Sequence, residues 1–343
     1  MTRQRDSILP TEVTHPVSRR ALAATVIAVL ASGLLFNFGI KLLLEARPAL
    51  DNPTYAGFHV QWRRLTGLDA PVETLIIGDS SGRHGVDPAV LDEALGTTSV
   101  NLCTMGDAAI TNPAWQLEEY IRRHGPPRRA ILVAVHDVWK RRIKLPLIPR
   151  VPLRWGFWSR MRASLQLSRD EYREVFLSRF APVYAQDQTV LDLLMQPWDA
   201  GKRQLWFGKN GFSPLPEPDP DLARREFQSH NRWIAPAGWS ISPSSRRALD
   251  AMIAMAEEYG FELHVANSPL LVGMVEDEIF GPYLQECLDG LAGLVAGSPR
   301  AHLILAPPVE YPAEQMQSTD HIAAVAVPDF TRRLAAAVTA AER

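Results

Sequence analysis

Cysteine and excess charge are both scarce in this chain. Only Cys103 and Cys287 occur, far apart in the sequence, so neither a disulfide framework nor a zinc-binding motif is present. Lysine and arginine number 36 against 38 aspartate and glutamate residues, and this balance argues against a general nucleic-acid binder. No internal repeat, phosphate-binding loop, dinucleotide fingerprint or metal-ligand spacing is visible. We therefore expect no metal and no cofactor.

A single bridge between the two cysteines is possible, although Cys103 lies in the apolar run SVNLCTMG, which favours a buried thiol. Hydrophobic residues make up 46% and charged residues 22% of the chain, which is typical of a folded globular protein. Its 343 residues suit one large domain with an insertion, or two domains.

One long apolar run, ALAATVIAVLASGLLFNFGIKLLL at residues 21–44, stands near the N-terminus. As a helix its 24 residues would span roughly 36 Å, enough to cross a hydrocarbon core of about 30 Å. Few basic residues follow it before Val60, whereas four arginines precede it: Arg3, Arg5, Arg19 and Arg20. The positive-inside rule then predicts a cytoplasmic tail at residues 1–20 and an extracytoplasmic domain at residues 46–343, on the periplasmic or cell-surface side of the cytoplasmic membrane.

A cleaved signal peptide and a buried core helix are the alternatives for residues 21–44. A signal peptide usually has a shorter apolar region, and no good Ala-x-Ala cleavage site follows this one. A core helix would normally show a polar face, and this segment has none. We therefore interpret the run as a retained, single-pass transmembrane anchor.

Beyond the anchor, short apolar strands alternate with amphipathic helices. The clearest helix begins after Ser242, a candidate N-cap, and ends at Gly260; others follow Asn112 and cover about residues 324–340. This alternation predicts an α/β fold with a doubly wound, mostly parallel sheet, whose sites form beyond the carboxyl ends of its strands. The predicted strands are Glu73–Ile77, Ser99–Leu102, Ala130–Val135, Glu262–Ala266 and His302–Leu305.

The alternation breaks at about residues 145–240, which we interpret as a partly helical insertion near the site. Its aromatic side chains could stack on sugar rings or touch a membrane surface, but a small core for the insertion is favoured. The segment holds six of the nine tryptophans: Trp155, Trp158, Trp198, Trp206, Trp233 and Trp239.

Four ordered sequence blocks carry a family resemblance. The stretch LIIGDSSGRHGVDPAVL, from Leu75 to Leu91, resembles the first block of the SGNH/GDSL hydrolase superfamily, closest to its membrane-anchored branch. That branch includes the D-alanine transfer protein of teichoic acids and the O-acetylation accessory proteins of alginate and peptidoglycan. VNLCTMGDA resembles the second block, ILVAVHDVW takes the place of the third, and STDHIAAVAVPDFTRRLA resembles the closing block.

The resemblance implies acyl transfer through a serine ester. Ser80 would be the nucleophile and His321 its base, and backbone N–H groups at Ser80 and Gly106 would hold the oxyanion. Each residue also has a structural interpretation: Ser80 could satisfy the turn after a strand, His321 could cap the last helix, and Gly106 could serve a turn with positive φ. Taken together, the set favours catalysis.

Several positions depart from the family pattern. The acid three residues before the histidine is replaced by Ser318, so the acid is Asp320 in an irregular turn, another carboxylate, or absent. In the third block Ala134 and His136 replace glycine and asparagine, and in the closing block Ala326 replaces glycine. A neutral His136 could donate to the oxyanion, or could be a packed strand-end histidine.

Arg83 and His84 follow the nucleophile position directly. Arg83 could steer a carboxylate-bearing substrate, and His84 is a conceivable second base four residues after Ser80. We expect both to be rim residues that take no part in the chemistry.

Two functions of different classes follow from the sequence. The first is a membrane-anchored SGNH-like serine acyltransferase or esterase acting on acyl, most simply acetyl, esters of a cell-surface glycan. Relatives of this branch commonly work with a multi-spanning membrane-bound O-acyltransferase, so such a partner is expected. The alternative is a catalytically degenerate module of the same fold that binds a surface polymer or a membrane acyltransferase.

Overall fold

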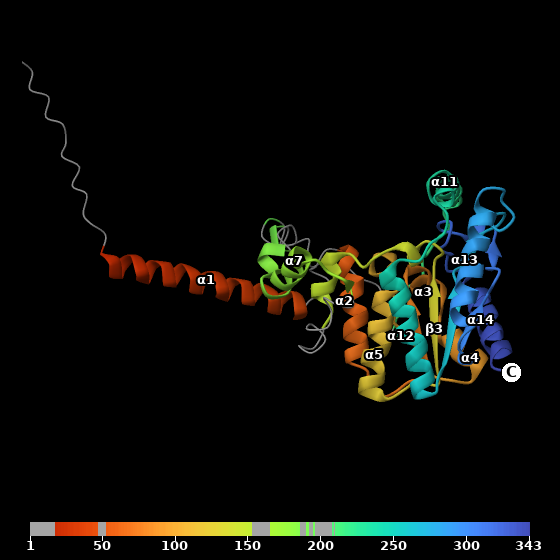
Figure 1. The fold of residues 1–343 in the computed structure, drawn as a ribbon, viewed down its shortest axis with the longest axis horizontal. Coiled ribbons are helices and arrows are strands. Elements are labelled where there is room, and N and C mark those ends of the chain that lie inside the picture. Colours follow the sequence, from red (N-terminus) through yellow and green to blue (C-terminus); the bar gives the residue numbers. More distant parts are fainter. Residues whose placement is uncertain are drawn as a thin grey trace, which may run out of the picture.

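The computed structural model describes residues 18–46, 53–152, 165–185, 190, 191, 195, 208 and 210–343. The fold is α/β, with a mostly parallel central sheet and a long apolar helix at the N-terminal end (Figure 1). Four of the six tryptophans in the predicted insertion lie outside the described residues: Trp155, Trp158, Trp198 and Trp206. Of the other two tryptophans, Trp233 is exposed. Trp239 packs against both of the buried hydrophobic clusters, which lie on the two faces of the sheet.

Five parallel strands form the central sheet in the order β2-β1-β3-β4-β6. They are β1 (Thr74–Gly78), β2 (Ser99–Asn101), β3 (Arg129–Ala134), β4 (Glu262–Asn267) and β6 (Ala301–Ile304). Every strand predicted from the sequence is present, with bounds within two residues of those expected. A separate two-stranded parallel ribbon pairs β5 (Leu270–Leu271) with β7 (Glu310–Tyr311).

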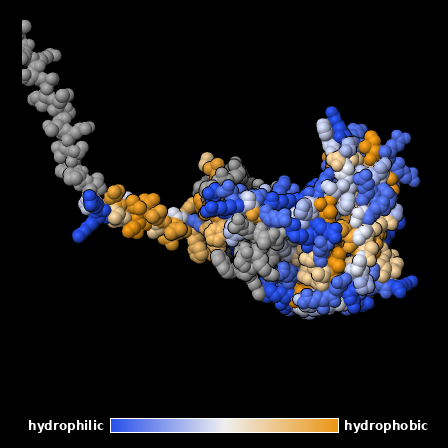
Figure 2. All heavy atoms as spheres, in the orientation of Figure 1, coloured by the Kyte–Doolittle hydropathy of each residue, from blue (hydrophilic) through white to orange (hydrophobic). Residues whose placement is uncertain are grey.

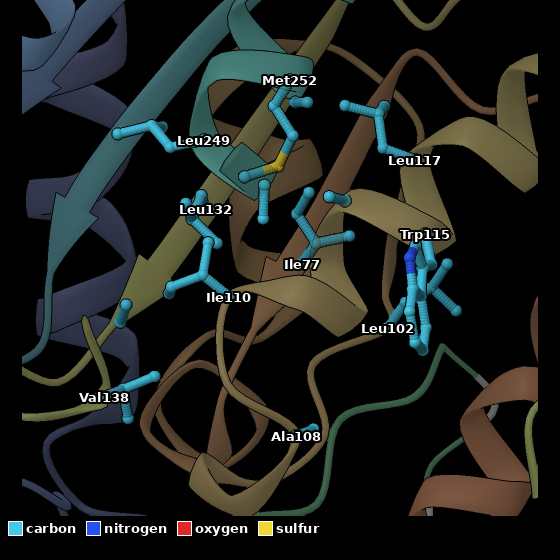
Figure 3. Packing of buried hydrophobic residues seen from close by; sticks show 14 of the residues in the cluster. Ile77, Leu102, Ala108, Ile110, Trp115, Leu117, Leu132, Val138, Leu249 and Met252 are labelled. Carbon is cyan, nitrogen blue, oxygen red and sulfur yellow. The ribbon is translucent and has the colours of Figure 1, made fainter. Parts of the chain in front are cut away.

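Helices cover both faces of the sheet because alternate strand residues point to opposite sides. Leu75, Ile77 and Leu132 pack on one face against α2 (Pro53–Thr66), α5 (Thr111–His124) and α12 (Pro243–Tyr259); Figure 3 shows part of this cluster. Ile76 and Val133 pack on the other face against helices that include α4 (Pro88–Leu95), α13 (Phe280–Val295) and α14 (Val327–Ala341).

The sequence signals for the ends of α12 work as expected, whereas Asn112 does not cap α5, which already begins at Thr111. Ser242 caps α12, its side chain accepting from the Ser245 amide, and Gly260 ends the helix with φ +77°. The remaining described helices are α1 (Arg19–Ala46), α3 (Ser80–Gly85), α7 (Arg169–Phe180), α8 (Pro182–Ala185) and α11 (Pro220–Ser229).

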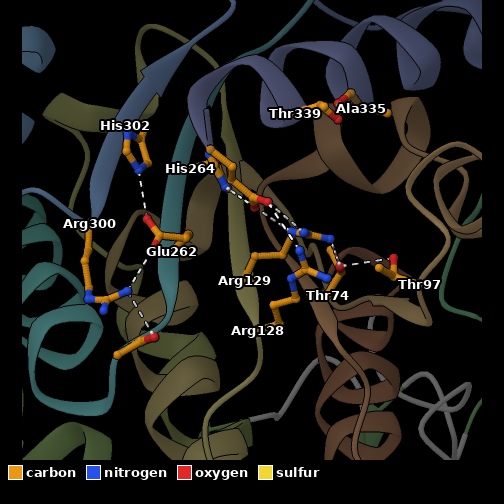
Figure 4. Close-up of polar contacts among 12 residues, drawn as sticks. Thr74, Thr97, Arg128, Arg129, Glu262, His264, Arg300, His302, Ala335 and Thr339 are labelled. Carbon is orange, nitrogen blue, oxygen red and sulfur yellow. Dashed lines mark hydrogen bonds and ion pairs between the residues drawn. The ribbon is translucent and has the colours of Figure 1, made fainter.

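A network of polar contacts joins the C-terminal end of the chain to the amino ends of β3 and β4 (Figure 4). Glu342 accepts from Arg129 at 2.8 and 2.9 Å and lies 3.3 Å from Nε2 of the buried His264. Burial lowers the pKa of His264 to about 4, so the ring is neutral there at neutral pH. This network lies at the end of the sheet opposite Ser80, and it stabilises the fold.

Candidate functional site

The chain turns sharply from β1 into α3, and this turn places Ser80 at the carboxyl edge of the sheet. Gly78 has φ +145°, and a Cβ there would lie 1.9 Å from the carbonyl oxygen of Val133, so only glycine fits. Asp79 is the N-cap of α3 and Ser80 its first residue. The small residues of the Gly-Asp-Ser sequence are therefore required by the turn.

Asp79 is a buried carboxylate that holds this turn together. One oxygen accepts from the amide and the hydroxyl of Ser81, at 2.8 and 2.6 Å, and the other accepts from the Val135 amide at 2.7 Å. Burial raises the pKa of Asp79, and these hydrogen bonds oppose the rise. The Ser81 hydroxyl is thus engaged inside the protein, whereas Ser80 is only half-buried.

His321 lies beside Ser80 although 241 positions separate them. Its Nε2 atom is 2.8 Å from Ser80 Oγ, and its Nδ1 atom is 2.5 Å from Asp320 Oδ1. Ser318, at the position where the family carries its acid, donates to Asp320 Oδ1 at 3.0 Å and lies 2.9 Å from His321 Nδ1. The structure therefore assembles a serine, a histidine and a carboxylate in a continuous chain.

An irregular loop makes the pairing of adjacent residues possible. The amides of Gln317 and Ser318 both donate to the carbonyl of His321, so the chain doubles back within a few residues. Glu226 of α11 accepts from the amide and the hydroxyl of Thr319, at 3.3 and 3.2 Å. No sequence pattern around Glu226 predicted this support, because Glu226 lies about 90 residues before the loop, within the predicted insertion.

The charges of Asp320 and His321 stabilise each other. Burial alone would lower the pKa of His321, but the adjacent Asp320 carboxylate reverses this, and the pKa lies above its ordinary value. Burial would raise the pKa of Asp320, yet His321 holds it well below its ordinary range. Asp320 is therefore ionised and fits the role of the acid, which the sequence left open.

Backbone amides suited to an oxyanion lie at the same edge. The amide of Thr104 donates to the carbonyl of Gly78 at 3.0 Å, and this bond places the chain after β2 beside the end of β1. Gly106 begins a short 3₁₀ turn just beyond this point, as Ser80 begins α3. First-turn amides have no partner within their helix, so both are available as donors by position. A Cβ at Gly106 would lie 2.7 Å from Arg141 Nη1.

His136 is packed at the end of β3 among aromatic rings. Its Nδ1 atom is 3.2 Å from the Tyr283 hydroxyl, and its ring meets Phe280, Tyr283 and His230 edge to face. Burial lowers its pKa to about 4, which keeps the imidazole neutral. Its buried Nε2 has no hydrogen-bond partner among the described residues. The packing matches a strand-end histidine, and the unsatisfied nitrogen is compatible with an oxyanion donor.

His84 is buried, so its predicted place on the rim is wrong. Its Nδ1 atom bonds to the carbonyl of Ser213, and its Nε2 atom is 2.7 Å from an Arg83 guanidinium nitrogen. Burial and the neighbouring Arg83 lower its pKa to about 3. The ring centroid lies 5.8 Å from that of His321, so His84 packs beside His321 while its Nε2 atom contacts the Arg83 guanidinium.

Within the described part of the chain, no group of three or more histidine, cysteine, aspartate or glutamate residues could hold a metal ion. Both cysteines are free and buried. The contacts of Ser80 with His321, and of His321 with Asp320, are an arrangement that can activate a serine hydroxyl.

Comparison with known proteins gives little further guidance. No family model and no curated protein sequence matches this chain. Among solved structures, a Streptococcus pneumonia protein provisionally named as a platelet activating factor matches over 91% of this chain and 97% of its own, at 11% identity and a TM-score of 0.39. A carbohydrate esterase family 2 enzyme with a carbohydrate-binding domain, from Corynascus thermopiles (Myceliophthora fergusii), matches over 80% and 68%, at 11% identity and a TM-score of 0.33. Scores this low carry no functional weight.

Proposed function

We propose that this protein is a membrane-anchored serine esterase or acyltransferase that acts on acyl esters of a cell-surface glycan. The observation that carries the proposal is the chain of contacts from Ser80 through His321 to Asp320. A serine hydroxyl is a poor nucleophile at neutral pH, and a base within hydrogen-bond reach, oriented by a carboxylate, is what activates it.

The reaction would run in two steps. Ser80 Oγ attacks the ester carbonyl while His321 Nε2 takes its proton, and the amides of Ser80 and Gly106 hold the oxyanion. The ester C–O bond breaks, the alcohol leaves with the proton from His321, and the acyl group stays on Ser80. A sugar hydroxyl or water, deprotonated by His321, then attacks the acyl-serine. The bond between the acyl carbon and Ser80 Oγ breaks, Ser80 Oγ takes the proton back from His321, and the new ester or the free acid leaves.

The location of the protein is part of the proposal. The described chain has one helix, Arg19–Leu43, that is long and apolar enough to cross a membrane, and it is not buried by the rest of the protein. We take it as an anchor with the catalytic domain outside the cytoplasm, for the reasons of charge given above. Because acetyl-CoA is cytoplasmic, a multi-spanning membrane-bound O-acyltransferase is the proposed donor of the acyl group.

Hydrolysis of para-nitrophenyl acetate by the full-length protein in detergent tests the catalytic proposal. Replacing Ser80 or His321 by alanine should each remove nearly all hydrolysis, and the double variant should be little worse, because the two act as one unit. Ser81→Ala is the matched control, since its hydroxyl bonds to Asp79 inside the protein. If the Ser80 variant keeps the wild-type rate, the alternative of a binding module of the same fold gains support.

A further inference from the structure

The long N-terminal helix contacts the rest of the protein through the two polar residues of its apolar run, Asn37 and Lys41. Asn37 donates to the carbonyl of Phe180 at 2.6 Å, and its side-chain oxygen accepts from the Val183 amide at 3.3 Å. The ammonium of Lys41, one turn further along, lies 5.9 Å from the centre of the Phe180 ring. The junction of α7 and α8 therefore rests directly on α1.

The depth of this contact follows from the length of the helix. Asn37 lies 18 residues after Arg19, or roughly 27 Å along the axis. If α1 spans a hydrocarbon core of about 30 Å from its arginine end, Asn37 lies near the outer limit of the core. An amide there needs hydrogen-bond partners, and the backbone at the end of α7 supplies them.

The exposed face of α7 changes character along its length. Arg173 and Glu174 are exposed near its beginning, whereas Leu177 and Phe180 take the same face nearer α1. The side chain of Leu177 is 39% exposed and that of Phe180 is 43% exposed, although large apolar side chains such as these are usually buried. On this face charged residues thus give way to apolar ones in the direction of the anchor. Arg179, in the last turn, is half-buried and donates to the carbonyl of Pro149 at 2.8 Å.

From these contacts we propose that the apolar end of α7, formed by Leu177 and Phe180, is inserted in the lipid of the outer leaflet beside α1. The inference rests on the proposed role of α1 as a transmembrane anchor. This end of α7 lies beside the exposed apolar side chains of α1, because the Phe180 ring and carbonyl contact Lys41 and Asn37. Figure 2 shows α1 as a mostly apolar rod outside the body of the protein. Lipid acyl chains are the occupant that covers both surfaces together.

This second contact has a functional consequence. A single helix would let the domain rotate and tilt freely above the bilayer, whereas an inserted α7 end fixes its orientation. The Lys41 ammonium then lies at headgroup depth, where such side chains normally extend to water. Arg173 and Glu174 lie on the aqueous side, so the charge pattern of α7 matches its proposed depth.

Fluorescence quenching by spin-labelled lipids tests this placement on the full-length protein in phosphatidylcholine nanodiscs. Cys103 and Cys287 are both 0% exposed, so an introduced surface cysteine can be labelled selectively with an environment-sensitive dye such as NBD. Three variants suffice: Leu177→Cys, Glu174→Cys on the same face one turn earlier, and Gly33→Cys in α1, where an added side chain meets nothing within 4 Å.

The label at Leu177 should be quenched several-fold more than that at Glu174 by a nitroxide near the headgroups. The label at Gly33 should be quenched best by a nitroxide deep in the acyl chains. Quenching at Gly33 with equal, weak quenching at Leu177 and Glu174 would overturn the insertion of α7 while leaving the anchor intact. Absence of quenching at Gly33 would overturn the anchor itself, and the insertion with it.

Discussion

His321 Nε2 lies 2.8 Å from Ser80 Oγ, and the same imidazole is held from its other side by Asp320. The proposed nucleophile comes from the end of β1 and the proposed base from the loop before α14, so the fold joins two distant parts of the chain. A hydrogen bond in this geometry allows the proton to move as the serine attacks.

Asp320→Asn should reduce ester hydrolysis by roughly 10²–10⁴-fold and change its pH profile. His321 must be neutral to act as a base, and Asp320 raises its pKa above the ordinary value. Wild-type activity should therefore rise with pH, with a midpoint above about 6.5. Without the carboxylate, burial dominates, and the midpoint should fall. Rates measured from pH 5 to 9 give both quantities.

Ser318→Ala is the matched control for that measurement. It removes one hydrogen bond to the Asp320 carboxylate while leaving the charge in place, a change of about 1.5–3 kcal/mol. The midpoint should stay near the wild-type value. An equal shift in the two variants would mean that the loop, and not the charge of Asp320, controls His321.

Gly78→Ala should destabilise the protein by more than about 3 kcal/mol. The new methyl would lie 1.9 Å from a backbone oxygen of β3, and φ is +145°. Gly96→Ala is the control, because Gly96 also has a positive φ of +63° but has nothing within 4 Å. The Gly96→Ala variant should lose only about 1 kcal/mol of its free energy of unfolding. Denaturant unfolding compares the two; similar losses would contradict the proposed packing of the turn.

Stability should fall as the pH is lowered from about 6.5 towards 4. His264 and His136 have pKa values lowered to about 4 by burial, so the unfolded chain binds protons in this window and the folded chain does not. His321 acts in the opposite direction because its pKa is raised. Thermal unfolding at pH 7 and pH 5 measures the balance, and replacing His264 by Asn should make the dependence shallower. A wild-type protein that is more stable at pH 5 would refute this assignment.

A reporter fusion tests the predicted membrane topology. Alkaline phosphatase fused after Arg343 should be active, because this enzyme folds only outside the cytoplasm, while a reporter that works only in the cytoplasm should be silent at the same position. The arginines before α1 are the physical reason for this orientation. The reverse pattern would place the catalytic domain in the cytoplasm and exclude a cell-surface glycan as substrate.

The sequence predicted the sheet well because its strands are buried runs flanked by strong helix signals. Leu75, Ile76 and Ile77 pack on alternating faces, yet all are apolar, so their burial is readable without coordinates. The helix limits at Ser242 and Gly260 were predicted by the same local chemistry of capping and positive φ.

The support of the site was less predictable because it depends on contacts between distant segments. The pairing of Asp320 with His321 requires a loop that doubles back, which no residue spacing encodes. Glu226 bonds to this loop from α11, and the buried His84 bonds to the carbonyl of Ser213, which is 129 residues further along the chain. His136 could be placed at a strand end, but its contact with Tyr283 could not be foreseen.

Covalent labelling by a fluorophosphonate, followed by intact-mass measurement, tests the central claim most directly. The probe reacts with a serine hydroxyl only where a base activates it, so it reports on Ser80 without knowledge of the natural substrate. We expect one adduct on the full-length wild-type protein and on Ser81→Ala, and none on Ser80→Ala or His321→Ala. An adduct that persists in Ser80→Ala, or no adduct on the wild type, would contradict the assignment of Ser80 as the nucleophile.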